Sequence, residues 1–405
     1  MGCHFFLLPT NATLSLASEE PPWGDTWEGR SRGGKGSLEL QPPLNLSHFQ
    51  QTNWRALPHV LIHSLARHRA RTKTASKACF CVVSALGPPV SDPKKARPAC
   101  GMHWTRACPH SLPVVVIDNA DVDYPGHPLC PALWPEVGPN ALCGGVGLHQ
   151  PTSVVERRKH CCEKRLKRVL RVTGGPPGLN RPVHVSCDTH TLTVPWLGHA
   201  RVAPALVTRR RGVRIAVAMG VVGHFQANRL GFTPWRMAIR NACLPTVNCS
   251  RAWVTQAGSN ARMAVELYSQ SVFCLQPPGD TLGRTAIAEA VAAGCIPVFF
   301  HPLQQELFQV HWDAKSQSIL YDWTAVPREE LSSRAQIMMT DLGAYSEARI
   351  AKMQRELLQL APGFVYSRPP APLPQTLRRS RINLDADAVD VLVTNLPKLF
   401  KQYGW

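Results

Sequence analysis

Residues 268–302 read YSQSVFCLQPPGDTLGRTAIAEAVAAGCIPVFFHP, and this stretch decides the fold. The apolar run SVFCLQ (271–276) is typical of a buried strand, and the Pro-Pro-Gly sequence after it breaks the strand. A helix is predicted to start at Asp280 or Thr281, either of which can cap it, and to end near Gly294. The run CIPVFF then resumes as a second strand. Two strands around one helix make a βαβ unit, which predicts a parallel sheet.

The turn and the helix start of this unit form a candidate anion site, because the open N-terminus of a helix favours negative charge. The turn contributes Gly279, Asp280 and Thr281. Arg284 is expected in the first turn of the helix, where it can meet a diphosphate, and Glu289 can accept hydrogen bonds from ribose hydroxyls. Spacing alone equally allows Arg284 and Glu289 to be a solvent-exposed pair on an ordinary crossover helix.

The same string is similar to a known signature. FCLQPPGD, an arginine five residues after the glycine, and GCIPVFFHP resemble the exostosin family of glycosyltransferases, above all its plant branch of xyloglucan galactosyltransferase-like proteins. Weaker similarity continues in residues 59–83, 209–220, 235–243 and 348–367. The resemblance covers roughly residues 57–396 and is dense only in the last third.

The resemblance implies an α/β fold in which two Rossmann-like domains face each other, the GT-B type of glycosyltransferase. Residues 1–50, rich in Pro, Gly and Ser, are then a poorly ordered leader. Residues 51–205 are the N-terminal Rossmann-like acceptor domain, and residues 206–370 are the C-terminal Rossmann-like domain for the nucleotide sugar. Residues 371–405 are a C-terminal segment with a helix.

Within the first domain, local patterns predict several elements. Residues 60–71 are typical of a helix, and residues 79–85 and the apolar segment that begins at 113 are typical of strands. The segment HCCEKRLKRVLRV (160–172) is predicted as a basic helix. The segment HVSCDTHTLTVPWLGHARV (184–202) is expected to add a strand or two before the domain junction.

The resemblance also implies a reaction. An inverting enzyme would move galactose or a related sugar from a nucleotide sugar, expected to be UDP-linked, to a polysaccharide or glycan acceptor. Asp188 is the candidate base, because it lies in the stretch that corresponds to the family's Asp-containing segment before the second domain. Arg236 can add positive charge near the nucleotide. Other glycosyltransferases are expected as partners.

No metal or other cofactor is expected for this reaction. The helix start and Arg284 would stabilise the leaving diphosphate instead. Asp121-Val-Asp123 has the D-x-D form that metal-dependent transferases use, but for this family it falls in the wrong domain. Loop carboxylates that cap turns are the plainer interpretation of these aspartates.

Two departures from the family pattern keep a second hypothesis open. Thr285 stands where the family usually has a second basic residue, and Ala288 with Glu289 stands where an aromatic residue and Asp are common. Glu289 retains the carboxylate, whereas Thr285 loses a positive charge. The alternative is therefore a catalytically inactive exostosin-like protein that binds glycans or acts as a scaffold.

Composition adds a third hypothesis. The 405 residues, 44% of them hydrophobic, are enough for two cores, and the formal net charge is +18. The basic runs at 157–159, 164–168 and 209–211 are either solvated surfaces or the site of a basic polyanion-binding protein. Nucleic acid is disfavoured, because no zinc-finger spacing, RNA-binding sheet signature or basic zipper accompanies the charge.

The cysteines and the N-terminus bear on compartment. Fourteen cysteines allow several disulfides whose pairing cannot be deduced, and Cys274 and Cys295 are expected to be small buried apolar residues. Three N-glycosylation sequons, at Asn11, Asn45 and Asn248, are compatible with a secretory lumen. The resemblance implies a Golgi membrane protein that faces the lumen. FFLLP, the only apolar run near the start, is too short to span a bilayer, so we expect the anchor to be missing from this sequence.

Overall fold

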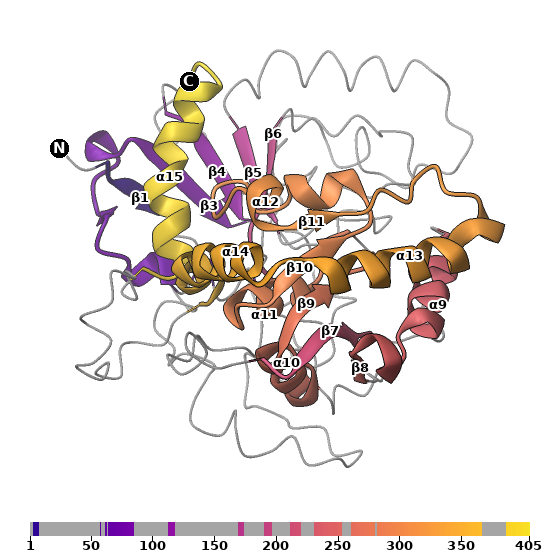
Figure 1. Cartoon of the computed structure of the whole chain (residues 1–405). Helices are drawn as coiled ribbons and strands as arrows, with labels where there is room; N and C mark the ends of the chain where they lie inside the picture. Colours follow the sequence, from indigo (N-terminus) through magenta and orange to yellow (C-terminus); the bar gives the residue numbers. More distant parts are fainter. Residues whose placement is uncertain are drawn as a thin grey trace, which may run out of the picture.

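The computed structural model describes two parallel β-sheets and their helices (Figure 1). The described residues are 3–7, 57, 61–62, 64–84, 112–117, 169–173, 190–196, 211–219, 231–252, 261–279, 282–366 and 386–405. Within these residues, no helix combines the length and the apolar character that crossing a bilayer requires.

The first sheet has six strands in the order β2-β1-β3-β4-β5-β6. All neighbouring strands are parallel. The strands are β1 (Phe5–Leu7), β2 (Arg71–Thr72), β3 (Phe80–Ser84), β4 (Val114–Ile117), β5 (Val169–Thr173) and β6 (His190–Thr193). Helical residues between 57 and 67 precede β2, and the short 3-10 helix η2 (Ala75–Lys77) precedes β3. Parallel pairing throughout agrees with the predicted α/β class.

The structure differs from the sequence-based expectations at two places in this part of the chain. Within the expected leader, Phe5–Leu7 form β1 between β2 and β3, because burial of the apolar Phe5 and Leu7 side chains stabilises a strand there. Residues 8–50, which make up the rest of the expected leader, lie outside the described residues. At the end of the predicted basic helix at 160–172, residues 169–172 form part of the strand β5 instead, because the buried Leu170 and Val172 suit a strand. Residues 160–168 lie outside the described residues.

The second sheet has five parallel strands in the order β11-β10-β9-β7-β8. They are β7 (Val213–Ala218), β8 (Cys249–Ala252), β9 (Ser271–Leu275), β10 (Ile296–Phe299) and β11 (Ile319–Leu320). The chain moves from β7 outward to β8 and then returns to β9 on the other side of β7. The point between β7 and β9 is therefore the topological switch point, and ligands of open α/β sheets bind at the carboxyl edge there.

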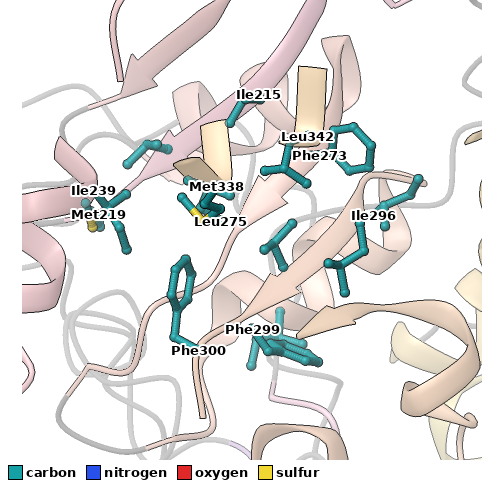
Figure 2. Close-up of a cluster of buried hydrophobic side chains, with 14 of the residues drawn as sticks. Ile215, Met219, Ile239, Phe273, Leu275, Ile296, Phe299, Phe300, Met338 and Leu342 are labelled. Atoms are coloured by element: carbon teal, nitrogen blue, oxygen red, sulfur yellow. The ribbon is translucent and has the colours of Figure 1, made fainter. Parts of the chain in front are cut away.

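Helices cover both faces of this sheet. The described α-helices of this half are α9 (Thr233–Ala242), α10 (Ala261–Gln270), α11 (Thr285–Ala292), α12 (Ala314–Gln317), α13 (Leu331–Ala344) and α14 (Glu347–Leu360), and α15 (Ala388–Gln402) follows them. Short 3-10 helices are η4 (Pro245–Val247), η5 (Pro302–Glu306), η6 (Arg328–Glu330) and η7 (Ala361–Phe364). On one face, Met338 and Leu342 of α13 pack against Ile215, Phe273 and Leu275 (Figure 2). On the other face, small residues of α10 and α11 pack against Ala216, Ala218 and Cys274.

The structure decides the cysteine pairing among the described residues. Cys274 of β9 and Cys295, just before β10, are fully buried, as predicted, and they form a disulfide that the sequence did not predict. Adjacent parallel strands bring the two Cα atoms to 5.8 Å, a distance that suits a disulfide. Cys243 pairs with Cys249 across a short loop, and Cys3 pairs with Cys79.

The C-terminal helix α15 returns to the first sheet, beside β1 and β3 in Figure 1. Its apolar side packs against the core that contains Phe5 and Phe80, while its N-terminal end contacts the second half of the chain. Near that end, the His311 ring hydrogen-bonds the Ala388 carbonyl oxygen at 3.1 Å. The Thr193 hydroxyl of β6 also accepts a hydrogen bond from the Phe308 backbone N–H at 2.8 Å. The two halves are thus joined by specific polar contacts.

Candidate active site at the carboxyl edge of the second sheet

The helix of the central βαβ unit begins later than the sequence predicts. Arg284 is the N-cap residue, with extended backbone, and α11 starts at Thr285, so the prediction of a start at Asp280 or Thr281 is wrong. The physical reason is Leu282, whose side chain is only 1% exposed in the core and holds the chain in a longer turn. The Gln304 side-chain amide also donates to the Leu282 carbonyl oxygen at 3.4 Å. The turn before α11 is therefore held by the burial of the Leu282 side chain and by the hydrogen bond from Gln304 to the Leu282 backbone.

Arg284 lies across the topological switch point. Its guanidinium donates to the carbonyl oxygen of Pro277, after β9, at 2.9 Å and to that of Ala218, the last residue of β7, at 3.5 Å. Gly279 lies against this side chain, since a Cβ there would be in ordinary van der Waals contact with Arg284 at 3.6 Å. Arg284, whose guanidinium group suits an anion, therefore lies where ligands of open α/β sheets bind.

Glu289 belongs to a buried polar group below this edge. Its side chain is only 5% exposed, so the interpretation of Glu289 and Arg284 as a solvent-exposed pair is wrong. Tyr268 and Gln276 are fully buried, and burial raises the pKa of Tyr268 to about 12, with smaller effects from Arg284 and Glu289. The Tyr268 hydroxyl and the Gln276 amide lie near each other at a geometry that completes no hydrogen bond within the described part of the chain. This pair of imperfectly matched polar groups is costly in a core.

Arg236 is the second predicted arginine. It lies in the first turn of α9 and is 6% exposed. Because α9 connects the parallel strands β7 and β8, its N-terminal end is at the same carboxyl edge as that of α11. The topology therefore brings Arg236 and Arg284 to one edge of the sheet.

The remaining predicted residues cannot be placed. Asp188, Asp280 and Thr281 lie outside the described residues, as do Asp121 and Asp123. Among the residues that are described, no group of three or more His, Cys, Asp or Glu side chains is arranged to hold a metal ion. Gly279, Arg284 and Glu289 are the predicted residues that the structure brings together in one βαβ unit.

Sequence reasoning missed Gln304, a fully buried residue of η5 that links three segments. Its amide nitrogen donates to the carbonyl oxygens of Gln276 and Leu282, and its oxygen accepts from the backbone N–H groups of Phe300 and His301. The ends of β9 and β10 and the turn before α11 are thus held together by one side chain. Gln304 could have been found from its position in the sequence, two residues after the His-Pro pair that follows the second predicted strand.

The two parallel sheets, each with a Rossmann-like order, and the returning C-terminal helix place the chain in the GT-B class that the sequence predicts. Solved structures similar to it include the GtfA/B complex, at 10% identity and a TM-score of 0.35, covering 80% of this chain and 57% of that one. Another is spinosyn rhamnosyltransferase SpnG with spinosyn aglycone, at 14% identity and a TM-score of 0.31, covering 79% of this chain and 76% of that one.

The family assignment comes from the second sheet. Residues 224–330 match the Exostosin GT47 domain, a segment that contains the whole candidate site from Gly279 to Glu289. The resemblance to the exostosin family is thereby confirmed over residues 224–330, and this part of the chain is similar to the plant xyloglucan galactosyltransferase-like proteins.

Curated relatives from Arabidopsis thaliana agree with this assignment. Probable xyloglucan galactosyltransferase GT12 is 32% identical over 108 residues, which are 26% of this chain and 20% of that protein. Xyloglucan galactosyltransferase XLT2 is 29% identical over 164 residues, which are 40% of this chain and 29% of that protein. The matches thus span less than a third of the length of these relatives.

Proposed function

We propose that this chain is an inverting glycosyltransferase that moves galactose or a related sugar from a nucleotide sugar to a polysaccharide or glycan acceptor. The observation that carries the proposal is the coincidence of two results. The exostosin match covers residues 224–330, and within it Arg284 occupies the switch point of a parallel sheet. Relatives named as xyloglucan galactosyltransferases favour UDP-galactose as the sugar donor and xyloglucan as the acceptor.

In the proposed reaction the sugar nucleotide binds at the carboxyl edge of the second sheet. Arg284 and the N-terminal end of α11 face the diphosphate, Arg236 adds positive charge, and Glu289 accepts hydrogen bonds from ribose hydroxyls. The acceptor oxygen attacks the anomeric carbon while the bond from that carbon to the diphosphate oxygen breaks, which inverts the configuration. Asp188 takes the acceptor proton. The positive potential around Arg284 stabilises the leaving diphosphate, so the proposed reaction requires no metal.

The proposed compartment is the Golgi lumen, with other glycosyltransferases as partners. The disulfides Cys243–Cys249 and Cys274–Cys295 support an oxidising compartment, and the exposed Asn248 begins one of the three sequons. Peptide mapping of the protein made in plant cells would test this part. A glycan on Asn248 supports the proposal, and unmodified Asn248 with free thiols contradicts it.

A transfer assay tests the central proposal. The purified chain is mixed with UDP-galactose and xyloglucan oligosaccharides, and a panel of other nucleotide sugars is compared by thermal shift. Arg284→Ala and Glu289→Gln are expected to weaken binding of the sugar donor at least tenfold. Asp313→Asn, an exposed change elsewhere in the same half, is the control. A folded protein with no turnover on any sugar donor would refute the enzymatic proposal.

An inactive exostosin-like protein is the second candidate, and Thr285 is the observation that favours it. The first residue of α11 is Thr285 where the family usually has a basic residue, which lowers the positive charge at the helix start. This candidate predicts binding of xyloglucan oligosaccharides without binding of UDP. Isothermal titration with the two ligands separates the candidates, because a measurable affinity for UDP contradicts the inactive form.

The polyanion-binding hypothesis is weakened at the basic run 209–211, which ends in Arg211. Arg211 donates to the backbone carbonyl oxygens of Tyr268, Ser271 and Ala293, and its burial lowers its pKa to about 10. This arginine joins the ends of helices to the sheet and does not face a ligand. Binding to heparin that survives both Arg284→Ala and Glu289→Gln would revive the hypothesis.

A further inference from the structure

His301 and Asp322 follow neighbouring strands at the carboxyl edge, although 20 residues of chain lie between them. His301 follows β10 and Asp322 follows β11, and these two strands are parallel neighbours. The pairing continues past the strands, because the Trp323 backbone N–H donates to the Phe300 carbonyl oxygen at 3.1 Å. The two side chains are close enough for the charge of each to affect the pKa of the other.

The ring of His301 is held in one orientation. Its Nδ1 accepts a hydrogen bond from the Leu303 backbone N–H at 3.1 Å, which caps η5. In the neutral ring the proton therefore resides on Nε2. Burial lowers the pKa of His301, against a smaller opposing effect of Asp322, so the ring is neutral at pH 7. Within the described residues Nε2 has no hydrogen-bond partner, although the side chain is only half-buried.

Asp322 is held in a similar way. Its Oδ1 accepts from the Thr324 backbone N–H at 2.9 Å and from the Thr324 hydroxyl at 2.6 Å. These hydrogen bonds lower the pKa of Asp322, so the carboxylate is charged at neutral pH. The side chain is exposed, and its second oxygen has no hydrogen-bond partner in the part of the chain that the structure describes.

Gln304 connects this pair to the candidate active site. Its side-chain oxygen accepts from the His301 backbone N–H at 3.2 Å, while its nitrogen donates to the Leu282 carbonyl oxygen in the turn before Arg284. The segment that begins at His301 also reaches the first sheet, through the hydrogen bond from Phe308 to Thr193. His301 and Asp322 therefore lie near the proposed diphosphate position. They also lie near the segment through which the second half of the chain contacts the first sheet.

We propose that His301 and Asp322 form a subsite for the hydroxyl groups of a sugar. A sugar hydroxyl both donates and accepts hydrogen bonds, and the ends of these two neighbouring strands offer a fixed N–H and a fixed carboxylate oxygen. The neutral ring adds no positive charge, which suits an uncharged hexose better than a phosphate. The inference rests on the proposed function and goes further by naming the residues that recognise a hexose, in the sugar donor or in the acceptor.

The test uses His301→Asn and Asp322→Asn in the full chain. Asn at position 301 can keep the cap of η5, because its side-chain oxygen can accept from Leu303, but it lacks Nε2. Asn at position 322 keeps the hydrogen bonds to Thr324 but replaces the second carboxylate oxygen with a hydrogen-bond donor. Asp313→Asn is the matched control, since Asp313 is exposed and its side chain forms no cap. Thermal unfolding confirms that each variant is folded.

Binding of UDP and of UDP-galactose is measured by titration, and KM is measured for xyloglucan oligosaccharides. We expect either the affinity for UDP-galactose to fall about 3- to 10-fold or the KM for the acceptor to rise by the same factor, with UDP binding unchanged. A loss confined to UDP-galactose affinity assigns the subsite to the sugar donor, and a rise confined to the acceptor KM assigns it to the acceptor. Unchanged values in both folded variants overturn the subsite while leaving the proposed function intact. No binding of UDP by the unaltered chain overturns both.

Discussion

His311 makes the stability of this protein depend on pH. The side chain is 4% exposed, and its Nε2–H donates to the Ala388 carbonyl oxygen at the start of α15. Burial lowers the pKa of His311 to about 4, against a smaller opposing effect of that hydrogen bond. The ring is therefore neutral in the folded protein, and the other ring nitrogen, Nδ1, is buried without a hydrogen bond among the described residues.

The sign follows from the two protonation states. In the unfolded chain a histidine has a pKa near 6.5, so below this value the unfolded state binds a proton that the folded state excludes. Stability is then lost as the pH falls from about 6.5 to about 4, at about 1.4 kcal/mol for each pH unit. Between pH 7 and pH 5 the loss attributable to His311 is about 2 kcal/mol.

Urea unfolding at pH 7 and pH 5 checks this value, with His311→Gln as the comparison. The glutamine amide can still donate to the Ala388 carbonyl oxygen, but it does not titrate. Carboxylates such as Asp387 and Asp390, near the same end of α15, affect both proteins alike. The unaltered chain should lose about 2 kcal/mol more than His311→Gln between the two pH values. Equal losses, with equal dependence on urea, would refute the reasoning.

Three further predictions concern the second half. Gly294→Ala should cost at least about 2 kcal/mol, because φ there is +66° and the new Cβ would lie 2.8 Å from a leucine of α14; an unchanged urea midpoint would contradict this. Replacing both Cys274 and Cys295 by Ala should cost about 3 kcal/mol, since the disulfide closes a loop with a sequence separation of 21; a melting temperature equal to that of the oxidised protein would count against it. Arg211→Met should cost about 2–4 kcal/mol in urea unfolding by leaving buried carbonyl groups unpaired, whereas the exposed Arg328→Met should cost almost nothing; similar costs would show that Arg211 is not structural.

Much of the second half was predictable from local pattern. The apolar runs around residues 271–276 and 295–300 became β9 and β10, and Gly294 ends the helix between them with a positive φ. The start of that helix was not predictable, because Asp280 and Thr281 are good caps and nothing local shows that Leu282 will be buried. Likewise, local pattern gave no reason to expect a strand at Phe5–Leu7, since its partners β2 and β3 are distant in sequence.

By itself, the stretch at 268–302 determined the βαβ unit and its resemblance to the exostosin family, because strand, turn and helix preferences act over a few residues. Only the tertiary structure decided which side chains meet. It paired Cys274 with Cys295, turned Arg284 across the switch point and brought His301 and Asp322 to the ends of neighbouring strands. These contacts depend on which strands become neighbours, and strand order is set by the burial of the whole sheet between its helices rather than by any local sequence.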